Sequence, residues 1–145
     1  MSKPWQMSLL TVVIGVAAFF TGPQIWPAGH DVPMPPPNLL PGYIALSAVE
    51  ALAFGFAVAF AVFGWQAIRG LGLGARWLNK MLFVTLCWLM GNWWIHDNLH
   101  MHNGLDMNGL LYIELAFHMT LLGCGIVLAV SFMRLGKHAV AGKTA

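Results

Sequence analysis

A small set of carboxylate and imidazole side chains is embedded in an otherwise apolar sequence. Its members are Glu50, His96, Asp97, His100, Glu114 and His118. His96 and His100 are four residues apart, so a helix would place both imidazoles on one face. Glu114 and His118 have the same spacing, and in a helix they could reach a common partner.

Imidazole and carboxylate groups in this combination are ligands of transition metals. Imidazole suits copper, zinc, iron and nickel, and added carboxylates favour iron, zinc or copper over calcium. Thioether sulfur would shift the preference toward copper, and Met101, Met107 and Met119 lie in the same part of the sequence. The set therefore predicts a site for a transition metal, copper or iron.

The surrounding sequence has the composition of a membrane protein. Of its 145 residues, 59% are hydrophobic and 8% are charged, too few charges for a water-soluble surface. Four apolar stretches are long enough to cross a hydrocarbon core about 30 Å thick as helices. They cover residues 5–21, 43–68, 78–95 and 110–133. We predict one all-α domain over residues 1–145, an integral membrane four-helix bundle in contact with the lipid bilayer.

The positive charges predict how this bundle lies in the membrane. Lysine and arginine concentrate in cytoplasmic loops, and a four-span arrangement puts all seven on one side. They are Lys3, Arg69, Arg76, Lys80, Arg134, Lys137 and Lys143. Both termini are expected in the cytoplasm, with a bacterial-type inner membrane as the location, and the segments 22–42 and 96–109 outside. Cleavage of the first segment as a signal peptide is an alternative that keeps this sidedness.

The predicted topology brings the carboxylates and imidazoles to the outer half of the bundle. A charge within the hydrocarbon costs several kcal/mol unless it is paired, so a glutamate there is a functional candidate. Asn92, His96 and His100 recur every four residues and share a face if the third helix extends that far. This face is expected to meet the acids and histidine of the second and fourth helices in one metal pocket on the non-cytoplasmic side.

The same residues allow other interpretations. Glu50 could only bond a hydroxyl or an imidazole across the bundle, and residues 96–102 could be a solvated loop. Glu114 and His118 could pair only with each other. A polar pocket that handles protons or binds a substrate without metal is a further alternative.

The segment that opens the last apolar stretch resembles a known motif. It reads His102-Asn103-Gly104-Leu105-Asp106-Met107-Asn108-Gly109. This segment is similar to a His-x-Gly-x-x-x-Asn-Gly signature of small four-helix membrane isomerases, such as styrene oxide isomerase and, more loosely, hydroxylaminobenzene mutase. The resemblance implies a haem b cofactor with His102 as the axial ligand and Asn108 beside it. It also implies isomerisation of a small apolar substrate that enters from lipid.

Three functions therefore compete. The first is a membrane metalloprotein with a His/Glu site, an oxidoreductase or a subunit of one. The second is a haem-dependent isomerase, and the third is a non-catalytic subunit of a larger membrane complex. Small residues at Ser47, Ala51, Gly55 and Ala59 predict a central helix and could also serve partner helices, so we expect an oligomer or a subunit. A net charge of only +2 does not indicate nucleic-acid binding.

Overall fold

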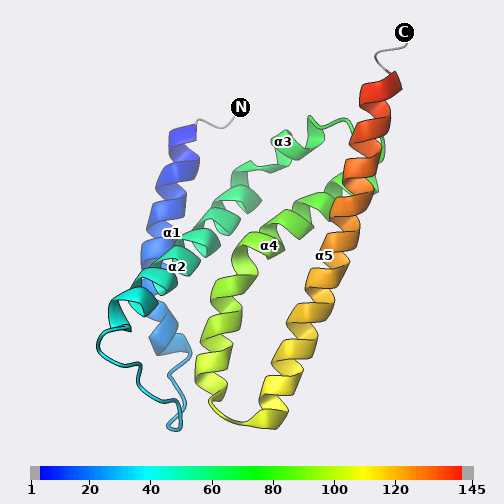
Figure 1. The fold of residues 1–145 in the computed structure, drawn as a ribbon. Helices are drawn as coiled ribbons and strands as arrows, with labels where there is room; N and C mark the ends of the chain where they lie inside the picture. The colour runs from blue at the N-terminus through cyan, green and yellow to red at the C-terminus, as the bar shows by residue number, and fades with distance from the viewer. Residues whose placement is uncertain (1–3, 142–145) are drawn as a thin grey trace.

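The computed structural model describes residues 4–141, with side chains as far as Gly136, and all secondary structure in this range is helical. The helices are α1 (Pro4–Ile25), α2 (Leu40–Phe63), α3 (Trp65–Arg69), α4 (Arg76–Asn103) and α5 (Met107–Ala141) (Figure 1). The all-α prediction is confirmed for these residues. Lys3 and Lys143 lie outside the described residues, as does the side chain of Lys137.

Three of the described helices are long and apolar enough to cross a membrane. They are α1, α2 and the part of α5 from Met107 to Gly136. α4 is 28 residues long but less apolar, because it begins with Arg76 and Lys80 and ends in a polar turn. Association with a membrane therefore follows from α1, α2 and α5.

Two helices have bounds that differ from the predicted spans. The span predicted over residues 43–68 corresponds to two helices, because α2 ends at Phe63 and α3 begins at Trp65. Gly64 separates them; a Cβ built on it would overlap the Phe60 ring, and glycine weakens a helix interior. α4 continues to Asn103, so much of the segment expected as a loop is helical. The condition for the shared face of His96 and His100 is met.

The helices pack in the order α1, α2, α4, α5. α2 lies between α1 and α4, as its small residues predict, and Trp94 of α4 is buried with Ala18 and Ala51. Phe54 and Trp26 cover the same indole, with ring centroids 4.5 and 5.2 Å away. Both described chain ends lie at the same end of the molecule as α3 (Figure 1). The α1–α2 loop and the α4–α5 turn lie at the opposite end.

The α4–α5 turn is a compact corner tied to the α1–α2 loop. Gly104 adopts a φ of 62°, which favours glycine, and Asp106 accepts hydrogen bonds from the backbone N–H groups of Asn108 and Gly109 at the start of α5. Asp31 of the α1–α2 loop accepts a 2.8 Å hydrogen bond from the N–H of Leu105. The corner therefore fixes how α4 and α5 meet near the predicted site.

Candidate metal centre

Three donor atoms from α4 and α5 converge at one point. The Nε2 atoms of His96 and His100 are 3.0 Å apart, and the Nε2 of His100 lies 3.0 Å from Oε1 of Glu114. The Nε2 of His96 lies 4.0 Å from the same oxygen. We call His96, His100 and Glu114 the trio. All three are partly buried, with side chains 25%, 29% and 39% exposed respectively.

The trio cannot satisfy its own hydrogen-bonding needs with neutral imidazoles. A neutral imidazole carries one N–H, and an ionised carboxylate only accepts. If His100 donates to Glu114 from Nε2, no hydrogen remains on that atom for His96, and if His96 donates to His100, the carboxylate faces a lone pair. A cation at the centre would relieve this conflict, since all three atoms could then act as ligands.

The spacing of the three atoms matches a metal site. Two donors that each lie about 2.1 Å from a tetrahedral metal are about 3.4 Å apart. The separations of 3.0, 3.0 and 4.0 Å fall on either side of that value. Among the residues that the structure describes, the trio is the group of His, Cys, Asp and Glu side chains close enough together to hold a metal ion.

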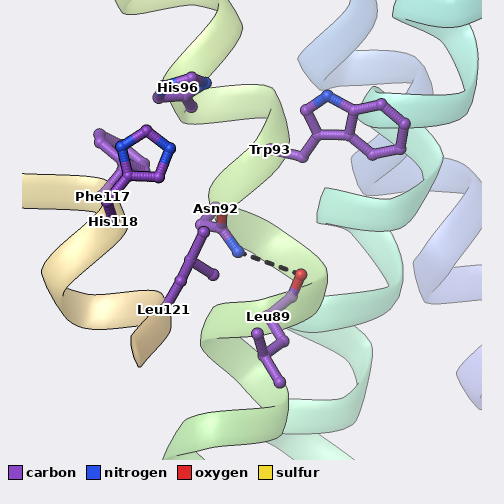
Figure 2. Close-up of a pocket in the computed structure, with 7 residues that line it drawn as sticks. All are labelled: Leu89, Asn92, Trp93, His96, Phe117, His118 and Leu121. Carbon is purple, nitrogen blue, oxygen red and sulfur yellow. Dashed lines mark hydrogen bonds between the residues drawn. The ribbon is translucent and has the colours of Figure 1, made fainter. Parts of the chain in front are cut away.

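The second oxygen of Glu114 is held by His118. Its Oε2 lies 3.0 Å from Nδ1 of His118, one turn further along α5. Phe117 packs against His96 with ring centroids 4.7 Å apart and stacks on Trp88 at 5.5 Å. His96 and His118 both face a groove between α4 and α5 (Figure 2). Sequence reasoning missed the contribution of Phe117, although its place beside His118 on a helix was the available signal.

Asp97 and Glu50 lie outside the trio, on the Nδ1 side of the His96 ring. Asp97 Oδ1 is 3.9 Å from Nδ1 of His96, the ring nitrogen that the trio does not use. The carboxyl group of Glu50, on α2, lies beside that of Asp97. Glu50 is only 2% exposed, and among the described residues its Oε1 has no hydrogen-bond partner. The structure therefore places Glu50 next to Asp97 and does not bring it into the trio, although one pocket was expected for all of these residues.

His102 and Asn108 are separate from the trio. The Nδ1 of His102 is 2.8 Å from the carbonyl oxygen of Pro27, so this imidazole bridges α4 and the α1–α2 loop. The side chain of Asn108 is exposed, and its backbone N–H is used in the cap at Asp106. Neither contact points to a haem ligand.

No family model, curated protein or solved structure matches this chain. The fold and site define an all-helical protein with apolar helices that could span a membrane and a His/Glu group that could bind a metal ion. Any more specific function has to be inferred from the geometry of the trio.

Proposed function

We propose that this chain is a membrane metalloprotein in which His96, His100 and Glu114 bind a redox-active metal, and that it is an oxidoreductase or a subunit of one. The observation that carries the proposal is the convergence of two imidazole nitrogens and one carboxylate oxygen within 4.0 Å of one another. A metal held by three protein ligands keeps positions open for an external ligand, which catalysis requires.

Iron is the metal that this donor set favours. Two histidines and one carboxylate are typical ligands of non-haem ferrous iron, whereas copper sites of the electron-transfer type use a sulfur ligand. The trio contains no sulfur, and Met101 and Met119, which could have favoured copper, are exposed. The same nitrogen and oxygen donors suit zinc, so metal analysis has to distinguish the two.

We further propose that α4 is a fourth span and that the trio lies on the non-cytoplasmic side. The described lysine and arginine residues fall on α3, at the start of α4 and near the end of α5. These elements gather at one end of the molecule together with both described chain ends (Figure 1). A lysine and arginine excess is typical of the cytoplasmic side, and the trio lies toward the opposite end.

Metal analysis of matched variants tests the metal proposal. We expect protein purified without chelators to contain about one iron per chain, and His100→Ala or Glu114→Ala to lose it, because each removes one of three ligands. His102→Ala is the control, since this histidine lies on the same helix but contacts Pro27. Wild-type protein free of iron, copper and zinc after aerobic and anaerobic loading would overturn the proposal. Equal metal in all four proteins would overturn the choice of ligands.

The proposal that the chain belongs to an oligomer or a larger membrane complex draws on the exposure of His118. This side chain is 69% exposed, although it lies three turns into a helix apolar enough to cross a membrane. A polar side chain at that depth is normally covered by protein. Mass measurement of the complex released in mild detergent tests this, and a bare monomer at every detergent concentration would contradict it.

A further inference from the structure

A groove runs between α4 and α5 and leads to the trio. Its volume is about 300 Å³, at the lower end of the roughly 300–1,000 Å³ typical of small-molecule sites. The apolar lining consists of Leu89, Trp93, Phe117 and Leu121. The groove is open along one side, and it lies on helices that we place in the membrane. A molecule could therefore reach it from lipid without crossing water.

The polar residues of the groove lie toward one end. His96 and His118 lie nearer the α4–α5 turn, whereas Leu89 and Leu121 lie further from it, with Asn92 between them (Figure 2). His96 is seven residues from Leu89, which is about 10 Å along the helix axis. A ligand with an apolar body and one polar end would match this gradient.

Asn92 offers an unused hydrogen-bond acceptor. Its side chain is buried, and its Nδ2 donates to the backbone oxygens of Trp88 and Leu89 at 2.7 and 3.1 Å. No described residue donates to its Oδ1. Because Asn92 lines the groove, a ligand that lies there is able to donate a hydrogen bond to this oxygen. A hydroxyl group is the simplest donor that also carries a lone pair for the metal one turn away.

We propose that this groove binds a lipid-soluble alcohol, with the apolar chain between Leu89 and Leu121 and the hydroxyl end at Asn92 and the trio. This inference rests on the proposed metal function, because it assigns the substrate class of the same site. A second groove of similar volume, between α2 and α4, is lined by apolar side chains such as Phe54, Val58 and Val84. Its lining exposes almost no polar surface that could orient a ligand.

Quenching of Trp93 by brominated probes tests the proposal in lipid nanodiscs. A decanol brominated at C2, the carbon next to the one that carries the hydroxyl, should give saturable quenching that unlabelled decanol reverses and that Trp93→Phe removes. Bromodecane, which has no hydroxyl, should bind at least about tenfold more weakly, a difference equivalent to one hydrogen bond of about 1.4 kcal/mol. In Asn92→Leu the preference for the alcohol should become smaller, because the hydrogen bond to Asn92 is lost while the metal contact remains.

Two neighbouring leucines provide a matched pair of variants. Leu121→Phe adds bulk inside the groove and should weaken binding of the brominated decanol, whereas Leu122→Phe, on an exposed face of α5, should not. Iron is measured in the same samples. Normal iron content with quenching that rises linearly and resists competition would overturn the groove proposal alone. Saturable quenching in protein that binds no metal would overturn the proposed function and the assignment of the alcohol as its substrate.

Discussion

The α1–α2 contact and the α4–α5 contact are built in opposite ways. Between α1 and α2, backbones touch: a Cβ placed on Gly55 would lie 2.7 Å from the backbone nitrogen of Gly15. Between α4 and α5, long side chains meet, with a polar trio and an open groove. A Cβ built on Gly123 or Gly125 of α5 would meet no described residue of another helix within 4 Å.

This difference indicates which part of the molecule supports the fold and which part carries function. Lipid gives helices no hydrophobic reason to associate, so close van der Waals packing of small residues has to hold α1 and α2 together. α5 packs less closely against α4 and leaves its own Gly123 and Gly125 uncovered, which leaves room for a metal, a ligand or another helix. Each prediction below tests one side of this contrast.

The largest effect is expected from Gly55→Ala. The added methyl group would also meet the carbonyl oxygen of Thr11, and both of these neighbours are backbone atoms that cannot rotate away. We expect a loss of about 2 kcal/mol in the free energy of unfolding, measured by denaturation in mixed micelles. Gly125→Ala is the matched control and should be neutral or stabilising by up to about 1 kcal/mol, because alanine favours a helix. Equal effects at the two positions would contradict the contrast.

A smaller effect is expected from Asp97→Asn. Its carboxylate lies near Nδ1 of His96, and a carboxylate behind a ligating imidazole orients the ring and increases its basicity. Iron affinity, measured by anaerobic titration, should fall about tenfold. Glu50→Gln should leave iron affinity unchanged, because Glu50 lies beside Asp97 and away from the trio. A large loss of iron affinity in Glu50→Gln would show that Glu50 belongs to the metal site.

Much of the helical scaffold could be predicted from the sequence, because apolar length is a local property. The break at Gly64 and the continuation of α4 to Asn103 were harder to predict, since helix ends depend on capping and tertiary contacts. The shared face of His96 and His100 follows from their spacing alone. The approach of Glu114 to that face could be predicted only as a consequence of adjacent helices packing together.

The place of Glu50 could not be predicted, because it depends on which faces of α2 and α4 meet. α2 turns Gly55 toward α1, and the contact of Gly91 with Ala57 sets its other face against α4. Glu50 then falls beside Asp97. His102 is a similar case, since its partner Pro27 is 75 residues away in the sequence.

An intermediate effect on stability is expected at the hydrogen bond that joins the α1–α2 loop to the α4–α5 turn. Asp31→Ala removes the acceptor of the Leu105 N–H and should cost about 1 kcal/mol of stability. Amide hydrogen exchange at the α4–α5 turn should become faster, because this hydrogen bond holds the turn against the α1–α2 loop. His30→Ala, at the adjacent loop position, is the control. An unchanged exchange rate at Leu105 in Asp31→Ala would show that the α4–α5 turn keeps its structure without this hydrogen bond.

The smallest effect is expected at the hydrogen bond between Trp88 and Thr120. The indole Nε1 of Trp88 donates to Oγ1 of Thr120 at 3.0 Å and joins α4 to α5 beside the stacked ring of Phe117. Trp88→Phe keeps an aromatic ring and Thr120→Val keeps the side-chain shape, so a double-mutant cycle isolates the bond. We expect a coupling of about 0.6 kcal/mol, since hydrogen bonds between membrane helices are weak on average. A coupling above about 2 kcal/mol would mean that this pair is held as firmly as α1 and α2, and the contrast between the two contacts would no longer stand.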